Sequence, residues 1–125
     1  MARQHRVLVV EDDETLRETL GEVMADEGHE VRLAANGVEG LERLEGWEAD
    51  LVILDLMMPL MDAYEFRTHQ RGAGASTDAP VLLLSAARDI EAAARQLEAK
   101  AWLAKPFVLT EMLDAVDRLL LERAS

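Results

Sequence analysis

Five short strand-like segments alternate along this chain with stretches in which apolar residues recur at helical spacing. The segments cover residues 7–10, 30–34, 51–54, 81–84 and 101–104. Strands that are separated by single helices pair in parallel, because each helix carries the chain back to the same end of the sheet. The alternation therefore predicts an α/β fold built on one parallel sheet.

The texture of the segments predicts their order in that sheet. Residues 7–10, 51–54 and 81–84 are continuously apolar, as expected for strands that are covered on both faces. Residues 29–34 alternate polar and apolar side chains and residues 101–104 form a short run, so these two segments are predicted at the edges. The resulting order, 2-1-3-4-5 with helices on both faces, is that of a flavodoxin-like fold.

Length and charge bound the class of protein. The chain has 125 residues, which fits a single domain with a core over about residues 6–121. We expect no output domain in this chain, which is either a stand-alone protein or a piece of a larger one. Its net charge is −12, which argues against direct binding of nucleic acid or of an anionic membrane. It has no cysteine and no long apolar stretch, and no signal peptide is apparent, so we expect a cytoplasmic protein.

Acidic residues follow two of the predicted strands. Glu11 and Asp12 come after the first strand, and Asp55 ends the third. In the order 2-1-3-4-5 these two strands are neighbours, and ligands of such sheets bind at their carboxyl ends. Converging carboxylates repel one another, and a bound Mg²⁺ would relieve that repulsion. Taken alone, however, the run from Glu11 to Asp13 is also typical of a solvated helix N-terminus.

Ser85 and Lys105 follow the fourth and fifth strands, and the predicted order places both at the same edge as the acids. A carboxylate nucleophile, a metal, an ammonium group and a hydroxyl group together form a phosphoryl-transfer site. Singly, Ser85 is equally compatible with a helix cap and Lys105 with a surface charge. Their joint placement at successive strand ends favours the functional interpretation.

This set of residues closely resembles that of a response-regulator receiver domain of two-component signalling, from Val7 to about Leu121. The resemblance implies that Asp55, in the motif D-L-M-M-P, accepts a phosphoryl group from a phosphohistidine of a sensor kinase or a phosphotransfer protein. Asp12 and Asp55 would bind Mg²⁺ directly, Glu11 mainly through water, and Met57 through its backbone carbonyl. Such a domain is not an enzyme in the usual sense, since it catalyses only its own phosphorylation and dephosphorylation.

The same resemblance implies a switch. Lys105 would contact the phosphoryl group and Ser85 would turn inward toward it, while the Lys105–Pro106 bond would be cis. Trp102 occupies the position of the family's switch aromatic, which is usually Tyr or Phe and moves inward with the serine; the alternative is that Trp102 only covers the edge of the sheet. Ala63 stands where the family often has Gly. In related domains the face formed by the fourth helix, the fifth strand and the fifth helix recognises a partner or a second copy after phosphorylation. We expect weak self-association at most and a downstream protein that the sequence does not identify; the face includes Arg95, Glu98, Lys100, Trp102, Asp117 and Arg118.

Two other functions conflict with the sequence and a third stays open. A phosphatase of the haloacid-dehalogenase class needs a second acid two residues after its nucleophile, where this chain has Met57. A flavodoxin proper needs a phosphate-binding loop after the first strand, where Glu11 and Asp12 would repel the phosphate. The remaining alternative is a pseudo-receiver, an interaction module that signals without phosphorylation. Only the two departures from the family pattern, Trp102 and Ala63, favour it.

Overall fold

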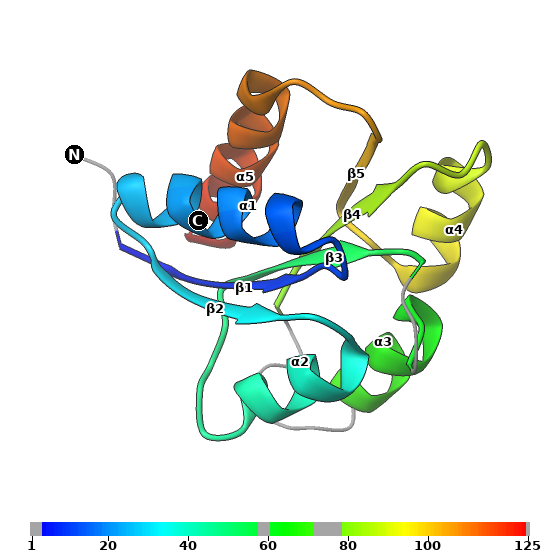
Figure 1. Cartoon of the computed structure of the whole chain (residues 1–125), viewed down its shortest axis with the longest axis horizontal. Helices are drawn as coiled ribbons and strands as arrows, with labels where there is room; N and C mark the ends of the chain where they lie inside the picture. The colour runs from blue at the N-terminus through cyan, green and yellow to red at the C-terminus, as the bar shows by residue number, and fades with distance from the viewer. Residues whose placement is uncertain (1–3, 58–60, 72–78, 125) are drawn as a thin grey trace.

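Strands and helices alternate strictly in the computed structural model, which describes residues 4–57, 61–71 and 79–124 (Figure 1). The strands pair in parallel in the order β2-β1-β3-β4-β5, so the flavodoxin-like fold predicted from the sequence is confirmed. The elements are β1 (Arg6–Val10), α1 (Glu14–Asp26), β2 (Glu30–Ala34), α2 (Gly37–Leu44), β3 (Leu51–Asp55), α3 (Ala63–Arg71), β4 (Val81–Ser85), α4 (Ile90–Leu97), β5 (Ala101–Ala104) and α5 (Leu109–Ala124).

Helices cover both faces of the sheet, α1 and α5 on one face and α2, α3 and α4 on the other (Figure 1). Successive residues of a strand point to opposite faces. Leu8 of β1 therefore packs in the core beneath α2, α3 and α4, whereas Val9 packs in the core beneath α1 and α5. Two buried faces explain why β1, β3 and β4 are continuously apolar. None of the described helices is both long and apolar enough to cross a membrane.

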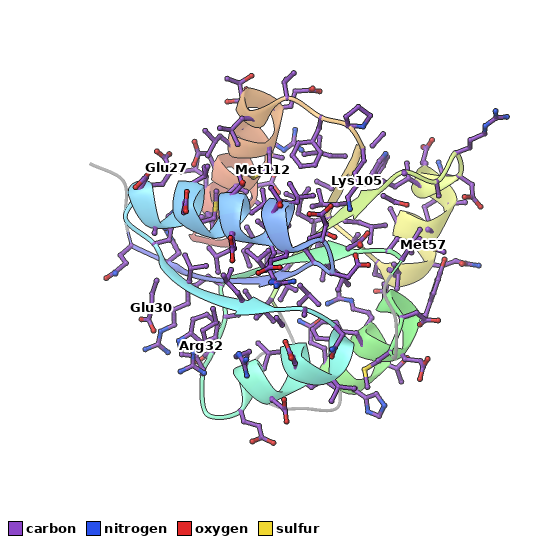
Figure 2. All side chains as sticks on the ribbon, in the orientation of Figure 1. Glu27, Glu30, Arg32, Met57, Lys105 and Met112 are labelled. Carbon is purple, nitrogen blue, oxygen red and sulfur yellow. The ribbon has the colours of Figure 1, made fainter. Side chains whose placement is uncertain are left out.

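The edge strand β2 is covered by side chains from the following segment. The Arg43 guanidinium of α2 donates from Nε to the carbonyl of Leu33, at 3.1 Å. Arg32 lies over the ring of Trp47, 4.5 Å from its centroid, and the Trp47 indole donates to Glu30 at 2.8 Å. Figure 2 shows Glu30 and Arg32 together along this strand. The polar and apolar residues of β2 thus alternate because Glu30 and Arg32 lie on one side of the strand, where side chains of the following segment contact them.

A buried arginine joins α3 to the C-terminal end of α4. The Arg67 side chain donates from Nε to the Leu97 carbonyl at 2.9 Å and from Nη1 to the Gln70 amide oxygen at 3.0 Å. Its Nη2 lies 3.4 Å from the carbonyl of Glu98, which has the left-handed φ of 56°. Arg67 and Gln70 are both buried. They explain why α3 has the weakest apolar stripe in the sequence, since polar residues occupy part of its inward face.

A histidine pair lies at the opposite end of the sheet from the acidic residues. His29 is buried before β2, and its Nδ1 accepts a hydrogen bond from the backbone N–H of His5 at 3.2 Å. Burial, together with the nearby charge of His5, lowers the pKa of His29 below its usual 6.5, although Asp117, Glu27 and Asp50 oppose the shift. The neutral ring is therefore favoured in the folded protein.

We expect acid to destabilise the fold through His29. Because its pKa is lower in the folded than in the unfolded state, the unfolded chain binds the proton more readily, and stability is lost as the pH falls below about 6.5. Urea unfolding at pH 7, 6 and 5 should show a smaller loss in His29→Asn than in the natural chain. The exposed His69 offers the control, His69→Asn. An equal loss in His29→Asn and the natural chain would contradict the prediction.

Candidate functional site

Three carboxylates meet where β1 and β3 end. One side-chain oxygen each of Glu11, Asp12 and Asp55 lies within 4.8 Å of the others. The pairing of Val10 with Leu54 places the ends of the two strands side by side, which brings these acids together as the sequence order predicts. Glu11 is 0% exposed and Asp55 3% exposed, whereas Asp12 is exposed. The cluster is thus buried on the Glu11 side and open to solvent at Asp12.

Lys105 reaches this cluster from the end of β5, across β4. Its Nζ donates to Glu11 Oε1 at 2.7 Å and lies 3.5 Å from Asp55 Oδ1. Figure 2 shows Lys105 above the end of the sheet near the connection that follows β5. Burial alone would lower the pKa of Lys105, but the hydrogen bond to Glu11 and the attraction of Asp55 outweigh burial and raise it. The side chain is therefore an ammonium ion that neutralises one of the acids.

One ammonium ion does not balance three carboxylates. Burial, followed by the neighbouring Asp12 and Glu11, raises the pKa of Asp55 to about 8, although Lys105 opposes the shift. For Asp12 burial acts in the same direction, but hydrogen bonding with the Asp55 and Glu11 carboxyl groups outweighs it and lowers the pKa. Asp55 consequently keeps a proton at neutral pH unless a cation displaces it. A compact set of hard oxygen donors with excess negative charge fits a divalent cation such as Mg²⁺.

Ser85 lies at the same edge, at the end of β4. It is fully buried, and its Oγ accepts a hydrogen bond from the backbone N–H of Ala87 at 2.9 Å. Pairing of Asp55 with Leu84 and of Ser85 with Ala104 puts the serine between the strand ends that carry Asp55 and Lys105. Its hydroxyl is thus engaged with the loop that leads to α4, and its hydrogen remains a donor.

The remaining predicted site residues lie either at this edge or on the face formed by α4, β5 and α5. The backbone N–H of Met57 donates to Asp55 Oδ1 at 3.3 Å, and its side chain is 68% exposed. The Lys105–Pro106 peptide bond is cis. Trp102 is 39% exposed on β5. Met58 and Pro59 of the D-L-M-M-P motif lie outside the described residues. The other residues predicted on the face of α4, β5 and α5 are exposed: Arg95, Glu98, Lys100, Asp117 and Arg118.

Two neighbours of the acids have structural contacts of their own. Asp13 caps α1, accepting from the Leu16 N–H at 3.0 Å, as its place in the acidic run indicated. Sequence reasoning missed Arg17, whose Nη1 donates to the backbone carbonyl of Glu11 at 2.9 Å and lies 3.4 Å from that of Asp12. The only signal for it is a basic residue one helical turn after the acidic run, which is too common to be specific.

Comparison with known proteins identifies the family of the chain. The family model described as response regulator receiver domain matches residues 7–117. The response regulator MprA of Mycobacterium sp. (strain KMS) is 40% identical over 122 residues, which is 96% of this chain and 52% of that protein. The chain therefore spans about half the length of the curated relatives it matches.

Solved structures of other response regulators have the same fold. A response regulator from Chloroflexus aurantiacus superposes with a TM-score of 0.85 at 31% identity, over 95% of this chain and 99% of that one. TrrA from Thermotoga maritima, solved in complex with Mg²⁺-BeF, has a TM-score of 0.79 at 33% identity, over 92% of this chain and 98% of that one. The likeness thus extends over nearly the whole described fold.

Proposed function

The chain belongs to the response-regulator receiver family, whose members are phosphoacceptor signalling domains, and on that premise we propose that Asp55 accepts the phosphoryl group. The observation that carries the proposal is the convergence of Asp55, two further carboxylates and Lys105 at one edge of the sheet. We propose a phosphohistidine of a sensor kinase or a phosphotransfer protein as the donor. The residues from 6 to 121 would act as one receiver unit in the cytoplasm, where such donors are phosphorylated.

The side chains of the chain have distinct roles in the transfer. An oxygen of ionised Asp55 attacks phosphorus, the new P–O bond forms, and the P–N bond to the donor histidine breaks, leaving the electron pair on nitrogen. Lys105, 3.5 Å from Asp55 Oδ1, is placed to contact an oxygen of the transferred group. Ser85 would donate its hydroxyl hydrogen to another oxygen, and Trp102 would move with Ser85. Hydrolysis of the resulting acyl phosphate would reset the domain.

We propose that Mg²⁺ is held by Asp12 and Asp55 directly, by Glu11 mainly through water, and by the backbone carbonyl of Met57. When bound, the ion supplies positive charge that displaces the proton of Asp55 and neutralises the phosphoryl oxygens. The fit of the acidic cluster supports this assignment, and so does the Mg²⁺-BeF complex of the relative TrrA.

The comparisons favour a phosphorylated receiver over a pseudo-receiver. Ala63 raised a doubt because the family often has Gly there, but Ala63 begins α3 and Glu98 is the one non-glycine residue with positive φ among those described. The alanine therefore causes no backbone strain at this place.

The downstream partner would bind the face of α4, β5 and α5, which also offers the surface for a weak phosphorylation-dependent dimer.

Acetyl phosphate tests the phosphoacceptor directly. Incubation of the chain with acetyl phosphate and Mg²⁺ should yield one phosphoryl adduct by intact mass, and Asp55→Ala should yield none. Asp89→Ala is the matched control, since Asp89 precedes α4 and makes no capping hydrogen bond with its side chain. A folded natural chain without an adduct would support the pseudo-receiver, and an adduct in Asp55→Ala would place the phosphoryl group elsewhere.

A further inference from the structure

Arg17 holds the backbone of the segment that carries two of the acids. It lies in the first half of α1, half-buried, and its guanidinium contacts the carbonyl oxygens of Glu11 at 2.9 Å and of Asp12 at 3.4 Å. Hydrogen bonds from a charged donor are stronger than those between neutral groups. A single planar group on two successive carbonyls restricts rotation of the peptide plane between them. The conformation of this short connection thus depends on a side chain outside it.

The two acids differ in how much they depend on that backbone. The Glu11 carboxylate is fixed at both oxygens, since Oε1 accepts from Lys105 at 2.7 Å and Oε2 from the Asp13 N–H at 3.2 Å. The Asp12 carboxylate is exposed, and its close neighbours are the carboxyl groups of Glu11 and Asp55, which repel it when ionised. The position of the Asp12 side chain therefore depends more on its own backbone than the position of the Glu11 side chain does.

From this geometry we propose that Arg17 is a positioning residue for the divalent cation, holding the backbone of Glu11 and Asp12 so that the Asp12 carboxylate converges with that of Asp55. The inference rests on the proposed magnesium site. Arg17 acts through the backbone carbonyls, whereas Lys105 is the cation that contacts the carboxylates themselves. Its removal should therefore weaken binding of the ion rather than change the charge of the cluster.

The test measures binding of MgCl₂ to the full chain by the rise in its thermal unfolding midpoint and by calorimetry. Residues that orient metal ligands typically contribute 10- to 100-fold in affinity, so Arg17→Met should weaken Mg²⁺ binding about tenfold. Arg17→Lys should show an intermediate loss, because the shorter lysine side chain keeps a charged donor but ends before the position of Nη1, the nitrogen through which Arg17 contacts both carbonyls. Arg43→Met is the matched control, since Arg43 also donates to a backbone carbonyl, that of Leu33 in the edge strand β2, and not to a carbonyl of the acidic segment.

The outcomes separate the inference from the function on which it rests. Mg²⁺ affinity of Arg17→Met within about twofold of the natural chain would overturn the role of Arg17 alone, as would an equal loss in Arg43→Met, which would indicate general loosening. A natural chain that binds no Mg²⁺ would overturn the magnesium site and the inference with it. If Arg17→Met does not fold, Arg17→Lys decides by the same criterion.

Discussion

Replacement of Asp55 by Asn is expected to raise the free energy of unfolding of the metal-free protein at pH 8 by up to about 5 kcal/mol. The pKa of Asp55 is raised by burial and by Asp12 and Glu11 from 3.8 to about 8 in the folded protein. The folded state therefore favours the protonated carboxyl, and its stability falls as the pH rises from about 4 through 8. An amide of the same shape does not ionise and avoids this loss. The gain should be smaller at pH 5, as measured by urea unfolding with EDTA present.

Magnesium distinguishes this explanation from a general effect of the substitution. A cation held by the carboxylates would remove much of their repulsion, so saturating Mg²⁺ should reduce the difference between Asp55→Asn and the natural chain. Asp50→Asn is the control, because Asp50 accepts from the Arg6 N–H at the other end of the sheet. That variant should change stability by less than about 0.5 kcal/mol at either pH. A gain for Asp55→Asn that is equal at pH 5 and pH 8 would contradict the prediction.

Arg67→Ala should lower the free energy of unfolding by about 3 kcal/mol. Its guanidinium is buried between α3 and α4 and donates to the Leu97 carbonyl and the Gln70 amide oxygen. Each buried acceptor that loses its donor costs about 1–3 kcal/mol, and the space left by the side chain adds to the loss. Urea unfolding at neutral pH measures the total. Amide exchange should rise most at the C-terminal end of α4, where Arg67 contacts the backbone.

Arg95 supplies the comparison for Arg67. It lies on α4 and pairs with Glu91 at 3.1 Å, but both side chains are largely exposed. Exposed pairs of this spacing contribute about 0.3–0.5 kcal/mol, so Arg95→Ala should have little effect. A loss below about 1 kcal/mol in Arg67→Ala would show that water replaces the guanidinium at these carbonyls.

Much of the fold could be predicted because a strand that is buried on both faces consists of consecutive apolar residues, whereas a strand at the edge does not. The continuous apolar runs of β1, β3 and β4 and the alternation in β2 were sufficient to order the sheet. The helix α3 was predicted least clearly, because Arg67 and Gln70 occupy buried positions. A buried polar residue is recognised only when its partners are known, and the Leu97 and Glu98 carbonyls that Arg67 contacts lie 30 and 31 residues away, in and after α4.

By itself, the sequence determined the strand order and the residues at each strand end, because alternation and burial are local properties of the chain. Given that order, Glu11, Asp12, Asp55, Ser85 and Lys105 had to lie along one edge. The tertiary structure alone decided which of them touch: Lys105 pairs with Glu11 at 2.7 Å, Ser85 contacts the loop before α4, and Arg17 fixes the backbone of the acids. Such contacts require that segments far apart in the chain are placed to within a few tenths of an ångström of one another. No local pattern of residues encodes that placement.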